Sequence, residues 1–146
     1  MRFNFGKPAA RAVIAGSAEA PMLRGTVTFH QQPNGVLVVA DVSGLPRQNG
    51  FYGFHIHEGK SCTGAGFADT GSHYNPTMLS HPNHAGDLPP LLGNSGRAFL
   101  AVMTDRLSIS DVLGRTVVIH SGPDDFTTQP AGNAGAKIGC GVIVKA

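Results

Sequence analysis

The sequence is short of the side chains that proteins use to hold nucleic acids. Tryptophan is absent, tyrosine occurs twice, 14% of the 146 residues are charged, and the net charge is +2. No run of lysine or arginine marks a surface that could follow a phosphate backbone, and there is little apparatus for stacking on bases. We therefore expect no nucleic-acid partner.

Long hydrophobic runs are also missing. No segment approaches the roughly 18 consecutive apolar residues of a membrane span, and residues 1–16 lack the apolar centre of a secretory signal. We therefore expect no membrane partner and, for the sequence as it stands, a cytoplasmic protein. An exported protein stays open, because a leader could have been removed.

Cysteine is scarce, with Cys62 and Cys140 as the two examples. One pair fits either a disulfide or two thiols, and a reducing cytosol by itself would favour thiols. Glycine and proline, by contrast, are abundant, at 20 and 10 residues. The length suits one core better than two, so we expect a single domain over residues 1–146 with frequent turns.

Short apolar or alternating segments lie between these turns and predict β-strands. Asn-Gly pairs at 34–35 and 49–50 predict tight connections between antiparallel neighbours. Because no segment keeps helical spacing for three turns, the pattern predicts an all-β sandwich or barrel. The expected strands cover residues 12–15, 25–29, 36–42, 51–57, 97–103, 116–120 and 138–144.

Two stretches, residues 58–94 and 121–136, break this rhythm and are predicted to be long loops. Loops longer than about 12 to 15 residues in a compact domain are usually functional or disordered. The first loop contains His73, His81, His84 and Asp87, and three imidazoles with one carboxylate make a complete tetrahedral set for zinc. A polar loop that contains histidines by chance is the alternative, but a metal would give order to a loop without regular structure.

Three other histidines lie in predicted strands. His55 and His57 alternate with apolar neighbours and would project from one side of a strand, which suits a single copper or zinc ion. Alternating polar residues on a solvent face are the simpler explanation of that pair. His120 ends a strand before the second loop and could face a cleft, whereas His30 stands beside a hairpin turn and is expected to be a polar surface residue.

Five segments, taken in order, resemble the copper,zinc superoxide dismutase family over about residues 10–144. They are GFHIHE (53–58), GSHYNP (71–76), HAGD (84–87), GRTVVIH (114–120) and GNAGAKIGCGVI (132–143). The resemblance implies an eight-stranded antiparallel Greek-key β-barrel, copper and zinc as cofactors, and superoxide as the substrate. It leaves a monomer and a homodimer both open.

The resemblance also implies two ligand sets that share one imidazolate bridge. Copper would be held by His55, His57, His73 and His120. Zinc would be held by His73, His81, His84 and Asp87. The spacing between His81 and His84 is shorter than in relatives, which predicts a strained zinc geometry and makes His81 the weakest member.

Other residues receive roles from the same resemblance. Asp124 would accept hydrogen bonds from His55 and His81, with a solvated acid as the alternative. Cys62 and Cys140 would form a disulfide that joins the metal loop to the last strand, with two buried thiols as the alternative.

Lys137 stands where most family members carry an arginine at the rim of the copper channel. An ammonium group keeps the charge but lacks the planar fork of a guanidinium, so we expect Lys137 to attract the anion and hold it less well. Residues 121–136 contain two acids and no cation, so electrostatic steering should be weak as well.

The function implied is the conversion of superoxide to dioxygen and hydrogen peroxide by copper redox cycling. His73 would carry the proton, and zinc, which has no redox change, would orient His73. The alternative is a dismutase-like protein that binds copper and zinc with little or no turnover. A hydrolytic zinc enzyme is disfavoured, because no open three-ligand zinc site with a separate general base is found.

Overall fold

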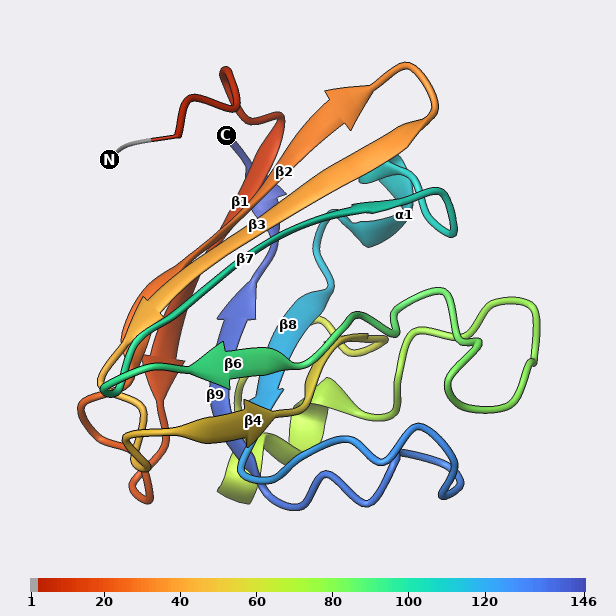
Figure 1. Cartoon of the computed structure of the whole chain (residues 1–146). Helices are drawn as coiled ribbons and strands as arrows, with labels where there is room; N and C mark the ends of the chain where they lie inside the picture. Colours follow the sequence, from red (N-terminus) through yellow and green to blue (C-terminus); the bar gives the residue numbers. More distant parts are fainter. Residues whose placement is uncertain (1–2) are drawn as a thin grey trace.

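The computed structural model describes residues 3–146, which are built almost entirely of antiparallel β-structure (Figure 1). Two short helical segments, η1 (Ala65–Thr70) and α1 (Ile109–Val112), interrupt the strands. Neither of these described helices has the length and apolar character needed to cross a membrane. The strands are β1 (Ala10–Gly16), β2 (Arg24–Gln32), β3 (Gly35–Ser43), β4 (Gly50–Tyr52), β5 (Phe54–His57), β6 (Leu91–Gly93), β7 (Ala98–Thr104), β8 (Thr116–His120), β9 (Lys137–Val142) and β10 (Val144–Lys145).

Eight of the strands form one curled sheet. Its order is β5-β8-β9-β1-β2-β3-β7, with β10 paired to β1, and β4 and β6 make a separate antiparallel pair. Strands far apart in sequence therefore lie side by side, as β3 and β7 or β5 and β8 do. The prediction of an all-β antiparallel barrel is confirmed, and the two long loops gather at the end of the molecule away from the chain termini (Figure 1).

The side chains that face the inside of the curl form the hydrophobic core. On β1 the buried residues Ala10, Ala12 and Ile14 alternate with exposed neighbours, because successive side chains of a strand point to opposite faces. Strand β5 is different, since all four of its residues are buried. Phe54 and Ile56 belong to the core, so the alternating histidines point to the other face of the strand, where the long loops cover them.

One of the two expected hairpins is present and the other is not. Gln32 pairs with Gly35 in the β2–β3 hairpin, as the first Asn-Gly pair predicts. The hairpin expected at positions 49–50 is wrong, because β4 pairs with β6 and β3 pairs with β7. The chain leaving β3 bonds instead to a turn after β6: Leu45 N–H donates to the Gly96 carbonyl, and Gly96 N–H donates to the Gln48 carbonyl.

The expectation that His30 is a polar surface residue is also wrong. Only 5% of His30 is exposed, and its Nε2 lies 2.9 Å from Thr28 Oγ1. The ring of Phe5, from the segment before β1, lies 6.2 Å from the imidazole. Burial lowers the pKa of His30, so the side chain is a neutral member of the interior.

The predicted disulfide between Cys62 and Cys140 is confirmed, and these two residues account for every cysteine of the chain. It joins the loop after β5 to the middle of β9 across 78 residues of sequence. Cross-linking residues so far apart removes much of the freedom of the unfolded chain.

Replacing both cysteines with serine should lower the free energy of unfolding of the metal-free protein by about 4 kcal/mol, since the long loop then opens in the unfolded state. Urea denaturation of the two proteins measures the difference. Reductant should shift the wild-type midpoint to that of the C62S/C140S variant and leave the variant's midpoint unchanged. Equal midpoints without reductant would show that the bond does not stabilise the fold.

Candidate metal centre

The first long loop is held against the free edge of β5 by main-chain hydrogen bonds. Tyr74 N–H donates to the Ile56 carbonyl at 2.8 Å, and Ile56 N–H donates to the Gly86 carbonyl at 2.8 Å. Isolated bridges place His73 beside His57, and Asp87 beside His55. The loop thus brings its own metal-binding side chains next to those of the strand.

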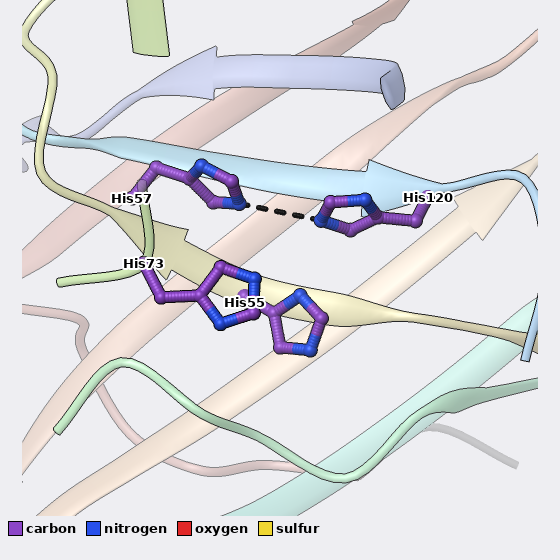
Figure 2. Close-up of side chains that lie close together, drawn as sticks. All are labelled: His55, His57, His73 and His120. Carbon is purple, nitrogen blue, oxygen red and sulfur yellow. Dashed lines mark hydrogen bonds between the residues drawn. The ribbon is translucent and has the colours of Figure 1, made fainter. Parts of the chain in front are cut away.

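Four imidazoles converge on the outer side of β5 and β8 (Figure 2). Their nearest ring nitrogens all lie within 4.8 Å of one another, and they belong to His55, His57, His73 and His120. Nε2 of His57 lies 3.2 Å from Nε2 of His120, and the rings of His55 and His73 are stacked with centroids 3.9 Å apart. The structure therefore brings together all four residues predicted to hold copper.

Three histidines of this cluster, His55, His57 and His120, each have one ring nitrogen that is hydrogen-bonded to a group outside the cluster. The lone pair of the other ring nitrogen is therefore directed into the cluster. His57 donates from Nδ1 to the Gly71 carbonyl at 2.8 Å, and His120 donates from Nδ1 to the Gly135 carbonyl at 3.2 Å. His55 bonds through Nε2 to Asp124 at 2.8 Å, and its buried Nδ1 has no hydrogen-bond partner. Buried polar atoms are rarely left without a partner, and ligand histidines are typically anchored through their second nitrogen, so the cluster fits a metal cation.

A second cluster uses the opposite nitrogen of His73. Its Nδ1 lies 2.8 Å from Asp87 Oδ1 and 3.2 Å from His84 Nδ1. Nδ1 of His81 and Nδ1 of His84 each lie 3.1 Å from Asp87 Oδ2. The cluster has the three-imidazole, one-carboxylate composition of a closed zinc site, and His73 faces the first cluster with a buried, unpartnered Nε2.

Despite the short spacing between His81 and His84, both imidazoles reach Asp87. A turn, in which Asn83 N–H donates to the Ser80 carbonyl at 2.8 Å, brings both imidazoles to Asp87. Their ring centroids are 5.5 Å apart. His81 therefore lies within the cluster where the prediction put it.

Asp124 connects the two clusters by accepting a hydrogen bond from one histidine of each. Its Oδ2 accepts from His55 Nε2 and its Oδ1 from His81 Nε2, both at 2.8 Å, and Phe126 N–H also donates to Oδ1. Burial alone would raise the pKa of Asp124, but the hydrogen bonds from His55 and His81 outweigh it and hold the pKa below its usual value. The carboxylate is therefore ionised and accepts from both rings, which leaves Nδ1 of each free for a metal.

Three imidazoles of the copper set, those of His55, His57 and His120, are neutral. Burial lowers the pKa of His57 to about 2 and that of His120 to about 3. Burial also lowers the pKa of His55. Metal binding requires the neutral imidazole, so these side chains need not lose a proton at neutral pH before they bind an ion.

A cavity of about 500 Å³ opens beside the first cluster. Its walls include His73, His120, Glu58 and Lys137. Lys137 is tied to the wall, because its Nζ donates to Thr70 Oγ1 at 2.7 Å and to the Gly71 carbonyl at 2.9 Å. The structure thus places the predicted cation at the cavity.

Several groups that shape the site were not predicted from the sequence. The carbonyls of Gly71 and Gly135 orient two histidines; both glycines belong to segments that resemble the family, but the resemblance gave these carbonyls no role. Gly132 is a third case, with φ +69°. A Cβ there would lie 2.0 Å from Asp124 Oδ1 and 2.6 Å from His81 Nε2, so only glycine lets the loop approach this pair.

Known proteins with similar sequences point in one direction. A family model described as copper/zinc superoxide dismutase matches residues 23–143. A Cu-Zn superoxide dismutase of Deinococcus radiodurans is 35% identical over 161 residues, which cover 96% of this chain and 86% of the relative. One from Legionella pneumophila is 37% identical, with 90% and 85% covered, and the Cu-Zn superoxide dismutase 3 of Arabidopsis thaliana is 38% identical, with 94% and 91% covered.

Solved structures share the fold. A double mutant of a SOD-like protein from Bacillus subtilis superimposes with a TM-score of 0.81 at 29% identity, covering 92% of this chain and 96% of that one. The clock protein EA4 also gives a TM-score of 0.81, at 33% identity with full coverage of both chains. The fold is therefore similar both to that of a SOD-like protein and to that of the clock protein EA4.

Replacing Gly132 with alanine should displace Asp124 or His81 and weaken zinc binding by at least about tenfold, the lower end of the effect seen when groups behind metal ligands are changed. A competition titration with a chromogenic chelator measures the affinity. Gly66→Ala is the matched control, because Gly66 has a similar φ of +60° but no atom within 4 Å of the added methyl group. Equal zinc affinities for the two variants would contradict the close contact described above.

Proposed function

Because the chain belongs to the copper/zinc superoxide dismutase family, whose members are oxidoreductases with copper and zinc cofactors, we propose that it converts superoxide to dioxygen and hydrogen peroxide at the two histidine clusters. One observation carries the proposal. The imidazole of His73 belongs to both clusters, with Nδ1 among the zinc-type groups and an unpartnered Nε2 among the copper-type nitrogens. His73 could therefore contribute one nitrogen to each ligand set.

The residues present suit one redox-active and one structural ion. Copper, when bound, supplies the one-electron redox change that dismutation needs, which zinc lacks. His55, His57, His73 and His120 would hold copper. His73, His81, His84 and Asp87 would hold zinc.

His73 would be the residue that moves the proton. Its Nδ1 is held at 2.8 Å by Asp87, and the residue lines the cavity that a small anion would enter. Nε2 would hold a proton and donate it to a peroxide that forms beside it. The outward nitrogens of His57 and His120 are bonded to main-chain carbonyls, so neither offers a second free nitrogen for this role.

Lys137 supplies the positive charge beside the cavity. Two of the three donors of its ammonium group are used by Thr70 and Gly71, which leaves one for an incoming anion. Glu58 also lines the cavity, and its carboxylate opposes the attraction. The proposed enzyme therefore guides superoxide with a single, partly occupied donor group.

A dismutase-like metal-binding protein with little turnover is the second candidate. The observation that favours it is Lys137, in place of the expected arginine, at a cavity that Glu58 also lines. The similarity of the fold to a SOD-like protein and to a clock protein is compatible with either candidate.

Reconstitution with copper and zinc, followed by a superoxide-decay assay, separates the two candidates. The proposal expects cyanide-sensitive decay that is much faster than with the same concentration of free copper ions. The His73→Ala variant should bind both metals, lose the spectroscopic signature of a bridged pair and lose most of the activity. A fully loaded wild-type protein no faster than free copper would favour the metal-binding candidate.

Replacing Lys137 with arginine should raise the rate severalfold at low ionic strength, because the planar guanidinium offers five donors and keeps some free for the anion. Pulse radiolysis at several salt concentrations measures the effect, and the gain should shrink as salt screens the charge. Lys145→Arg is the matched control, since Lys145 lies on β10 away from the cavity lining. An unchanged or lower rate for Lys137→Arg would show that another group guides the anion.

A further inference from the structure

The side chain of Gln129 forms a two-point clamp on the main chain of His81. Its Oε1 accepts from the His81 N–H at 2.8 Å, and its Nε2 donates to the His81 carbonyl at 2.7 Å. A second bond from Nε2 reaches the Thr127 carbonyl at 3.1 Å and fixes the amide within its own loop. No other described residue of the metal clusters has both main-chain groups bonded to a single side chain.

We infer that Gln129 is a positioning residue for the zinc set, acting through His81. The inference rests on the zinc set of the proposed function. His81 and His84 are only three residues apart in one tight turn. So short a segment has few main-chain torsions that can be adjusted to direct both imidazoles toward one ion. Gln129, which lies outside the turn, fixes the main chain of His81 and so helps to direct its imidazole toward the ion.

The turn is held from both ends. Gln129 grips the main chain of His81, while Arg106 donates from Nη1 to the Pro82 carbonyl at 2.9 Å and lies 3.5 Å from the His84 carbonyl. The imidazole of His81 is oriented separately by Asp124, which belongs to the same loop as Gln129. Main chain and imidazole of His81 are thus both fixed by the loop formed by residues 121–136.

The clamp also connects the zinc set to the copper side. Pro130 and Ala131, which directly follow Gln129, line the cavity beside the copper set. One short segment therefore includes both the side chain that holds His81 and part of the cavity wall.

A neutral amide is the group that this geometry requires. It offers one acceptor to the N–H of His81 and one donor to its carbonyl. The isosteric carboxylate of glutamate can accept but cannot donate, and it would repel the carbonyl oxygen. Glutamine to glutamate is therefore the sharpest change, because it alters one atom and keeps the shape.

The experiment compares Gln129→Glu and Gln129→Ala with wild type after loading with zinc and copper. Zinc release into a chromogenic chelator should be about tenfold faster or more in both variants, in line with the effect of groups that support metal ligands. With cobalt(II) in place of zinc, the visible absorption bands should shift in both variants, because His81 is no longer aimed at the ion. Copper content should stay at the wild-type level.

Gln31→Ala is the matched control. Gln31 also donates from its amide to main-chain carbonyls, those of Gln32 and Gly35, but it lies in the β2–β3 hairpin outside both clusters. This variant should release zinc and absorb as cobalt protein like wild type.

Two results would overturn the inference. One is wild-type zinc release and cobalt bands in both Gln129 variants. The other is an equal fall in the melting temperature of the metal-free and metal-loaded proteins with unchanged cobalt bands, which would make Gln129 a general loop stabiliser. A wild-type protein that binds neither zinc nor cobalt at this set would instead overturn the proposed zinc site itself.

Discussion

The carboxylate of Asp124 is the constraint on which the metal centre depends. Each of its oxygens receives one imidazole N–H, from His55 on the copper side and from His81 on the zinc side. A neutral imidazole carries one proton, so a donor at Nε2 must present a lone pair at Nδ1. One ionised, buried group thereby selects the tautomer of a histidine in each cluster before any ion arrives.

The remaining parts of the molecule hold this group in place. The curled sheet positions β5 and β8, and main-chain bonds attach the first long loop to the open edge of β5. In the second loop, Gly132 lies so close to Asp124 and His81 that a larger residue would collide with them. The disulfide then fastens the first loop to β9, so the loops are attached to a rigid scaffold at several separate points.

Much of this arrangement could be predicted from residue type and spacing. Strands such as β2, β3 and β8 consist of alternating or continuous apolar residues between clear turn residues. Imidazole and carboxylate side chains are recognisable in the sequence as possible metal ligands. The family resemblance supplied the pairing of the cysteines and the role of Asp124, which spacing alone left open. Each of these features depends on a side chain that the sequence displays.

The features that escaped prediction depend on groups or contacts that the sequence does not display. Every residue has a carbonyl, so nothing singled out those of Gly71 and Gly135 as hydrogen-bond acceptors for histidines. His30 is buried because a distant segment with Phe5 folds against it, and the Asn-Gly pair at 49–50 leads to a strand that pairs elsewhere. In both cases a tertiary contact decided against the local pattern.

The two ligand sets differ in how far apart their residues lie in the sequence. In the zinc set, His73 and Asp87 are 14 residues apart in the sequence. In the copper set, His57 and His120 are 63 residues apart and come from two different strands, β5 and β8. Bringing the second pair together in a flexible chain costs about 1.3 kcal/mol more in loop-closure entropy, and it also needs the β5–β8 pairing. The four zinc ligands therefore lie within residues 73–87, whereas the copper set is complete only when β5 and β8 are paired, so the site for the redox metal exists only in the folded barrel.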